Sequence, residues 1–266
     1  MLCPQCNTLL VGPTCPCGWV DSTLSSLDTS HEELPTYALQ RIEPQEFIMG
    51  SPQTENGRDP DEIEHPVHIN TPFAIGCTEV PQDLFMDIMG ENPSYFYGER
   101  KPVDTVSWFE ACAFCNAYSV AMKREPVYRF QETEVIWIRE ADGFRLPTEA
   151  EWELSARLAQ KHAPLGTRAW FQDNAGLETH HVGQSHGISD MAGNVWEWVW
   201  DWYGPYPQQS IDPIGPKHGV HRVARGGSWA DGIRIIRPAN RAYQIPDHES
   251  NTIGFRLAQT LFPEEP

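Results

Sequence analysis

The stretch DMAGNVWEW at residues 190–198, together with RGGSW at 225–229, decides the fold of this chain. Its glycines permit backbone angles and close chain approaches that a side chain would block. Its tryptophans supply large side chains that anchor a core where regular helices are scarce. The glycines are Gly193, Gly226 and Gly227, and the tryptophans are Trp196, Trp198 and Trp229. The pattern predicts a scaffold that rests on loops and short strands.

Three helices are predicted around this stretch from capping residues and hydrophobic spacing. The first follows Pro81 and ends at Gly90. The second begins after Ser107, which is placed to form a capping box with Glu110, and the third begins after Thr148 with the same device. Short strands are predicted at residues 47–49, 67–69 and 73–75, where apolar runs are bounded by turn residues.

Cys112 and Cys115 form a CxxC pair inside the second predicted helix. A CxxC pair at a helix start can hold a reactive thiolate. Here the helix has already begun, and both cysteines share the face of Trp108 and Tyr118. We therefore interpret them as small buried residues, and we interpret Cys77 in the same way.

The composition is that of an acidic globular chain. Its 266 residues carry a formal net charge of -18, and 40% of them are hydrophobic, which suffices for a sizeable core. A charge of this sign repels phosphate backbones and argues against nucleic-acid binding. The N-terminus has no apolar signal segment, no stretch is apolar enough to cross a bilayer, and seven cysteines do not suit a secreted disulfide framework. The sequence therefore predicts a cytoplasmic protein without a membrane partner.

The first residues contain two closely spaced cysteine pairs that suit tetrahedral zinc. Residues 1–19 are accordingly predicted to be a zinc-ribbon-like segment with a structural zinc ion, and free thiols are the alternative. The polar residues 20–36 have the composition of a linker, and the main domain is predicted over residues 37–262. The predicted zinc ligands are Cys3, Cys6, Cys15 and Cys17.

Several motifs, in order along the chain, resemble the formylglycine-generating-enzyme (sulfatase-modifying factor) family. Besides the two stretches quoted above, they are FIMGS at 47–51, GENP at 90–93, GFRLPTEAEW at 143–152 and IGFRLA at 253–258. The likeness covers roughly residues 40–260 and leaves the cysteine-rich segment outside. It implies an α+β domain with a C-type-lectin-like fold that is low in regular secondary structure.

The family's oxidase binds copper through two cysteines in the loop after the Gly-Gly-Ser-aromatic motif. Residues 230–253 read ADGIRIIRPANRAYQIPDHESNTI without a cysteine, so the resemblance implies no copper here. No catalytic set is evident elsewhere, and His180, His181 and His186 are interpreted as part of a solvated loop. The sequence favours a non-catalytic role, and a metal-dependent oxidase or modifying enzyme stays the alternative.

The resemblance implies that segment 190–197 wraps a calcium ion. The carboxylates of Asp190 and Glu197, with the carbonyl oxygens of Gly193 and Val195, would form the hard oxygen shell that Ca²⁺ prefers. The alternative is that the two carboxylates only cap backbone amides. Either role is structural.

Domains of this subgroup also serve as the variable proteins of diversity-generating retroelements, in which a C-terminal segment is rewritten at template adenines and the scaffold is kept. Here RGGSW and IGFR bracket a heterogeneous segment whose residues are mostly reachable from an asparagine codon by changing adenines. A surface that mixes apolar anchors with polar neighbours suits a protein or small-molecule ligand. The predicted ligand-binding residues are Trp229, Ala230, Asp231, Gly232, Ile233, Ile235, Ile236, Ala242, Tyr243, Gln244, Ile245, His248, Ser250 and Thr252.

We expect Arg225, Arg237, Arg241 and Arg256 to hold this segment in place through hydrogen bonds. The sequence thus predicts a ligand-binding protein that displays a variable C-terminal surface loop. Two further alternatives remain: an ordinary packed loop in an inactive family member, and an accessory subunit whose zinc ribbon docks a partner.

Overall fold

The structure is a computed structural model that describes residues 37–132, 134–160, 165–166, 168–183 and 187–263. Tyr37–Pro266 forms one compact unit. The predicted zinc-ribbon-like segment and linker, and His186, lie outside the described residues.

The helices of the described residues are α1 (Gln82–Met89), α2 (Trp108–Ala121) and α3 (Glu149–Gln160). Gly90 ends α1 in the left-handed conformation, and Ser107 and Glu110 form a complete capping box at the start of α2. Ahead of α3, the Glu151 amide donates to the Thr148 hydroxyl over 3.2 Å while the Thr148 amide donates to the Glu151 carboxylate over 2.8 Å. All three helix predictions are confirmed, because capping is decided by residues three positions apart.

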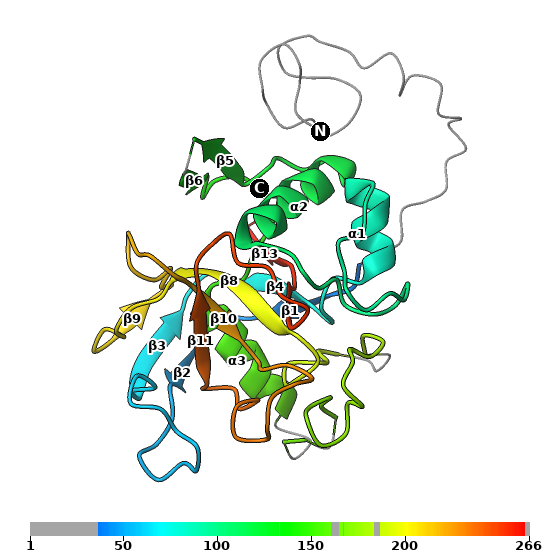
Figure 1. The fold of residues 1–266 in the computed structure, drawn as a ribbon. Helices are drawn as coiled ribbons and strands as arrows, with labels where there is room; N and C mark the ends of the chain where they lie inside the picture. The colour runs from blue at the N-terminus through cyan, green and yellow to red at the C-terminus, as the bar shows by residue number, and fades with distance from the viewer. Residues whose placement is uncertain (1–36, 133, 161–164, 167, 184–186, 264–266) are drawn as a thin grey trace, which may run out of the picture. The chain divides into compact units, whose positions relative to one another are not determined.

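Short strands form two four-stranded sheets, a three-stranded sheet and a hairpin in the described part of the chain. One sheet has the order β1-β4-β13-β7, so the first and last strands of the unit both pair with β4. The other has the order β11-β10-β8-β12, and Figure 1 shows β8, β10 and β11 side by side. The strands are β1 (Leu39–Ile42), β2 (Gln45–Met49), β3 (His65–Ile69), β4 (Phe73–Gly76), β5 (Tyr128–Gln131), β6 (Glu134–Trp137), β7 (Phe144–Arg145), β8 (Trp196–Trp202), β9 (Ser210–Ile211), β10 (Arg222–Arg225), β11 (Arg241–Gln244), β12 (Ile253–Phe255) and β13 (Ala258–Thr260).

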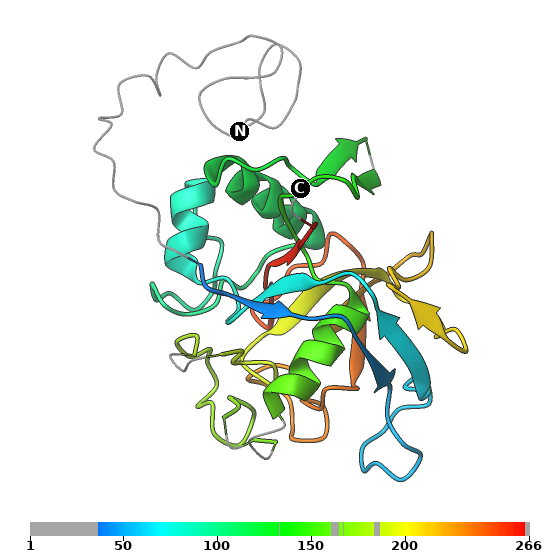
Figure 2. The same ribbon diagram turned by 180° about the vertical axis from the view of Figure 1, so that it is seen from behind.

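This mixture of few helices and many short strands is the α+β architecture that the sequence predicts. The three strands predicted from apolar runs correspond to β2, β3 and β4 and are confirmed. Seen from behind, α3 crosses the back of the sheet that contains β8 and β10 (Figure 2). Trp152 on α3 packs there with Val199 and Val223 of those strands.

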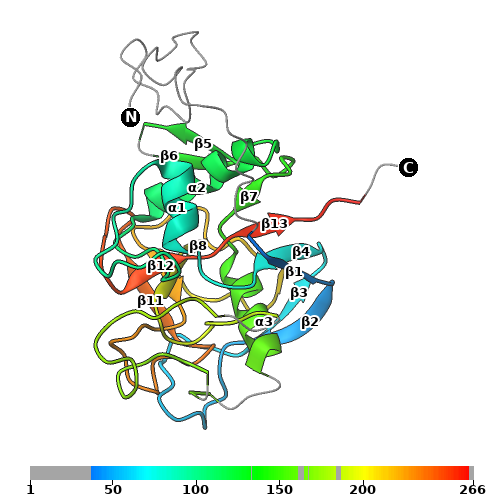
Figure 3. The same cartoon turned by 90° about the vertical axis from the view of Figure 1, so that its right-hand side faces the viewer.

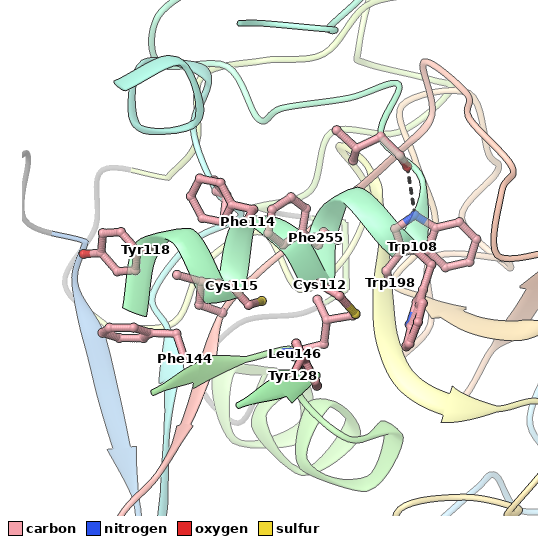
Figure 4. Packing of buried hydrophobic residues seen from close by; sticks show 14 of the residues in the cluster. Trp108, Cys112, Phe114, Cys115, Tyr118, Tyr128, Phe144, Leu146, Trp198 and Phe255 are labelled. Atoms are coloured by element: carbon pink, nitrogen blue, oxygen red, sulfur yellow. Dashed lines mark hydrogen bonds between the residues drawn. The ribbon is translucent and has the colours of Figure 1, made fainter. Parts of the chain in front are cut away.

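The largest core cluster surrounds α2 (Figure 4). Cys112 and Cys115 are fully buried in it, as predicted, and burial raises the pKa of both thiols well above its usual value. Trp108 fixes the start of the helix by donating from Nε1 to the Val199 carbonyl over 2.9 Å. Cys77 is only partly buried, so the prediction that it is a buried residue is confirmed only in part.

The tryptophan anchors of the sequence motifs are not equally buried. Trp198 is fully buried, and Trp196 is partly buried and packs against the largest core cluster. Trp229 is also only partly buried, so the prediction of a buried anchor is confirmed in full for Trp198 alone. Trp229 begins the surface segment described below, and Trp196 donates a hydrogen bond to Asp231 of that segment. Gly193 behaves as predicted: its φ is +78°, and a Cβ there would lie 2.0 Å from the Trp170 carbonyl oxygen.

Candidate functional site: the 229–252 surface

Segment 229–252 is not a single loop. It comprises a turn-rich stretch at 229–240, the strand β11, and a second irregular stretch at 245–252. β11 pairs with β10 and forms an edge of its sheet. Sequence reasoning missed this strand because its residues, RAYQ, form no apolar run like those that marked the predicted strands.

Arg225 joins the turn-rich stretch to α3. Its guanidinium donates to Glu149 over 2.9 Å, to Glu153 over 2.5 Å and to the Pro238 carbonyl over 2.5 Å. The side chain is fully buried, so these charge-assisted bonds are shielded from solvent. Arg225 therefore fixes the backbone of the segment from beneath, as predicted.

Arg237 and Arg241 extend the same support. Arg237 forms a bidentate pair with Glu62, at 2.9 and 2.7 Å, and donates from Nε to the Arg234 carbonyl within the segment. Although burial opposes ionisation of Glu62, bonds from Arg237 and Ser51 lower its pKa to about 2. Burial also opposes ionisation of Glu149, yet Arg241 and Arg225 together bring its pKa below the usual value.

Arg256 does not have the predicted role. Its guanidinium binds Glu197 at 2.5 and 2.7 Å and donates to the carbonyls of Gly76 and Ser189. These partners lie outside segment 229–252, so the prediction that Arg256 holds the segment is wrong. The residue instead links β8 to the end of β4 and to Ser189.

The predicted ligand-binding residues separate into three exposure classes. Ile236 is fully buried and packs on Gly227, where a Cβ would meet its Cγ2 at 2.6 Å, so Ile236 belongs to the core and cannot reach a ligand. The exposed members are Ala230, Ile233, Tyr243, Gln244 and Ile245. The partly buried members are Trp229, Asp231, Gly232, Ile235, Ala242, His248, Ser250 and Thr252.

Asp231 is held as part of the scaffold. Its carboxylate accepts bonds from the Trp196 indole over 2.9 Å and from the Ser228 amide and hydroxyl over 2.9 and 2.5 Å. Tyr243, in contrast, stacks on Tyr203 with ring centroids 4.1 Å apart and stays about half exposed.

An aromatic cluster that the sequence analysis missed borders Trp229. The Phe96 ring meets the Trp229 indole edge-on, with centroids 5.3 Å apart. Its neighbours Tyr95 and Tyr97 are 67% and 74% exposed, which is unusual for such large side chains. The signal that could have found them is the aromatic run at 95–97 after Pro93 in a polar stretch.

Two other loops meet the segment (Figure 3). The loop that follows α1 and the loop that precedes β8 lie with segment 229–252 on the left-hand side of that view. The Thr105 amide donates to the Ser250 carbonyl over 3.0 Å, and the Gln172 amide donates to the Asp231 carbonyl over 2.9 Å. Three chain regions far apart in sequence are thus in contact with one another through segment 229–252.

The predicted solvated histidine loop is only partly confirmed. His181 is exposed, but His180 stacks on Trp170 with centroids 3.7 Å apart and bonds to the Ala175 carbonyl over 2.7 Å. Both histidines line a cavity of about 500 Å³ that also includes Lys101.

The predicted calcium ligands already have protein partners. Both Glu197 oxygens accept bonds from Arg256, and one also accepts from the Trp152 indole over 2.7 Å. Asp190 accepts from the Gly183 amide, and burial raises its pKa to about 6. Close by, Glu79 Oε1 is buried without a partner among the described residues.

This donor set fits a cation only in part. Asp190 and the orphan oxygen of Glu79 are hard donors, whereas the charge of Glu197 is already balanced by Arg256. Within the described residues, no group of three or more His, Cys, Asp or Glu side chains is arranged to hold a metal ion. Calcium binding here stays a prediction.

Residues 27–261 match the model of the sulfatase-modifying factor enzyme 1-like domain. The chain belongs to this family. Among curated relatives, the chaperone protein LppX of Paenibacillus barcinonensis is 34% identical over 205 residues, which is 60% of this chain and 70% of that protein. The formylglycine-generating enzyme of Streptomyces coelicolor is 37% identical over 146 residues, or 44% of this chain and 46% of that enzyme.

A solved structure of a similar protein matches almost the whole domain. Treponema denticola variable protein 1 has 30% sequence identity and a TM-score of 0.76, and the match covers 84% of this chain and 95% of that protein. The family assignment made from the motifs is therefore confirmed, and the architecture agrees with a C-type-lectin-like fold. In the described part of this family member, no helix is long and apolar enough to cross a membrane.

Proposed function

We propose that this protein is a non-catalytic ligand-binding protein that displays segment 229–252 as a variable surface. The observation that carries the proposal is the separation between buried side chains, which hold the backbone of the segment, and exposed side chains, which are free to vary. Buried arginines hold the backbone of the segment, while Ala230, Ile233 and Ile245 point their side chains outward.

This separation matters energetically. Removing one partner of a buried ion pair costs roughly 3–5 kcal/mol, whereas surface substitutions away from such features stay within about 0.5 kcal/mol. The exposed positions can therefore change without loss of the fold. A binding protein whose surface is rewritten requires this property.

The surface chemistry favours a macromolecular ligand. Tyr95, Tyr97 and Tyr243 are exposed, and Trp229 is partly buried. Tyrosine and tryptophan are enriched at protein interfaces because they offer a large apolar area with a polar edge. The likeness to Treponema denticola variable protein 1 supports the same proposal.

The genomic test examines the 3′ end of the gene and its flanks. We expect a near-copy of codons 225–256 that differs only at adenines, with a reverse transcriptase gene close by. Absence of both would contradict retroelement diversification and leave a family member with a fixed surface.

A metal-dependent oxidase remains the second candidate, because the Streptomyces coelicolor relative is a formylglycine-generating enzyme. The absence of cysteine from residues 230–253 weighs against the copper chemistry. Stoichiometric copper or iron in the purified protein, together with turnover of a cysteine-containing peptide, would favour the oxidase. Metal-independent binding would favour the display role.

A further inference from the structure

A cavity of about 450 Å³ lies between the start of α3 and the loop at 203–216. None of its lining residues belongs to the exposed display positions described above. On the α3 side it is lined by Glu149, Ala150, Asp201 and Met49, and on the loop side by Tyr206, Ser210 and Ile214. Its volume lies within the range of small-molecule sites.

The loop wall of this cavity is held rigidly. Four prolines, Pro205, Pro207, Pro213 and Pro216, restrict its backbone. Asp212 ties the loop to the turn after β3 by accepting from the Asn70 amide over 2.8 Å and from the Thr71 hydroxyl over 3.0 Å. A cavity with such walls needs little ordering when a ligand binds.

Tyr206 is fixed as firmly as the loop that carries it. Its hydroxyl donates to Glu149 over 3.0 Å, and its ring contacts His65, with centroids 4.6 Å apart. The Arg241 guanidinium lies over the same ring, 4.0 Å from its centroid. The aromatic wall is therefore in place before any ligand arrives.

Ser210 carries a polar atom that the protein does not satisfy. Its Oγ is buried and has no hydrogen-bond partner among the described residues, and Ser210 is one of the residues that line the cavity. An unpaired buried hydroxyl costs about 1–3 kcal/mol, and such groups in native structures call for an explanation. A ligand hydroxyl or amide at this atom supplies one.

Two charged residues that line the cavity, Glu149 and Arg241, balance each other. Glu149 is paired with Arg241 and Arg225. Burial and the adjacent charge of Glu149 raise the pKa of Asp201 well above its usual value, which favours its uncharged form. The remaining lining is mostly apolar, including Met49, Ala150 and Ile214. An ionic ligand would lose its hydration, and the paired charges of Glu149 and Arg241 would offer it no free countercharge.

We propose that this cavity binds a small uncharged molecule with an apolar body and a hydroxyl or amide group that pairs with Ser210 Oγ. Apart from Arg241, which belongs to β11, the lining residues lie outside segment 229–252, and the proposal does not rest on the function proposed for that segment.

Three probes with the same ring test the ligand class. Ligand-observed NMR on the full chain compares benzyl alcohol, benzoate and benzylamine at neutral pH. We expect saturable benzyl alcohol binding with a Kd on the order of millimolar, as a molecule of this size permits. Both charged probes should bind at least about tenfold more weakly.

Variants locate the binding. Ile214→Trp fills the rim of the cavity and should weaken benzyl alcohol binding about tenfold or more. The matched control is Ile211→Trp on β9, whose side chain is 66% exposed and does not line the cavity, and which should bind like the wild type. Ser210→Ala removes the orphan hydroxyl, and it should weaken binding about fivefold without lowering the Tm.

Several results would overturn the proposal. These are no saturable benzyl alcohol binding up to about 20 mM, equal binding of benzoate, or equal losses for Ile214→Trp and Ile211→Trp. If Ile214→Trp fails to fold, Ser210→Ala decides alone, and unchanged affinity in that variant contradicts the assigned contact.

Discussion

Arg225 and Glu153 form an ion pair with 2.5 Å between guanidinium and carboxylate, and neither side chain is exposed to solvent. The pair connects β10 to α3, and Arg225 also donates to the Pro238 carbonyl. The RGGSW motif is therefore bonded at once to the scaffold and to the segment that the scaffold displays.

Arg225→Gln should destabilise the domain by about 3–5 kcal/mol, because Glu149 and Glu153 would lose a buried countercharge. The measurement is urea unfolding at neutral pH. The matched control is Arg41→Gln, which removes an exposed ion pair with Glu43 and should leave the midpoint unchanged. Similar midpoints for the two variants would show that the buried pair does not support the fold.

Ile236→Ala and Ile233→Ala test the boundary between core and display surface. Ile236 is fully buried and Ile233 is 40% exposed, although only three positions separate them. We expect a loss of about 2–4 kcal/mol for Ile236→Ala and less than about 0.5 kcal/mol for Ile233→Ala. Equal losses in chemical denaturation would mean that the segment is an ordinary packed loop.

That isoleucine pair also shows where sequence reasoning stops. Both residues occupy the same kind of irregular segment, and only the contact between Ile236 and Gly227 makes one of them core. Similarly, Phe96 and Trp229 are far apart in sequence and meet only in the folded chain. Neither contact leaves a local pattern, so both escaped the sequence analysis.

Local devices were predictable for the opposite reason. Ser107 and Glu110 of the capping box are only three positions apart, and the residue type of Gly193 alone indicates a left-handed turn. The arginines lie between these cases. The sequence predicts that Arg237 holds the segment through hydrogen bonds, but it does not identify the partner Glu62, which is 175 residues away.

Zinc content tests the prediction for the cysteine-rich segment 1–19. We expect one zinc ion per purified chain, bound through the four thiolates of that segment. Cys3→Ser combined with Cys6→Ser should remove the zinc and leave the unfolding of the main domain unchanged. Elemental analysis and a thermal melt provide both readouts. Zinc retained in the double variant would place the metal elsewhere.

Calcium binding is tested by thermal stability. If Asp190 and Glu197 contribute to a calcium shell, millimolar Ca²⁺ should raise the Tm above its value with a chelator, because a ligand that binds only the folded state stabilises it. Mg²⁺, which demands a stricter geometry, is the control. No difference between Ca²⁺ and chelator would favour the alternative in which Asp190 only caps the Gly183 amide.

The pH dependence of stability should reveal the buried carboxyl group of Asp190. Burial raises its pKa from the ordinary 3.8 to about 6, so between these values the folded state holds a proton that the unfolded state has released. Stability must then fall as pH rises through this window, by roughly 2–3 kcal/mol.

Asp190→Asn cannot titrate and keeps an oxygen that can accept from the Gly183 amide. It should flatten the slope between pH 4 and 6 and unfold at a higher urea concentration than the wild type at neutral pH. Unfolding series across this range, without added metal, measure both effects. An unchanged slope would assign the titration to another group, and the first to examine would be Glu79, whose pKa is raised by burial and then by the charge of Asp190.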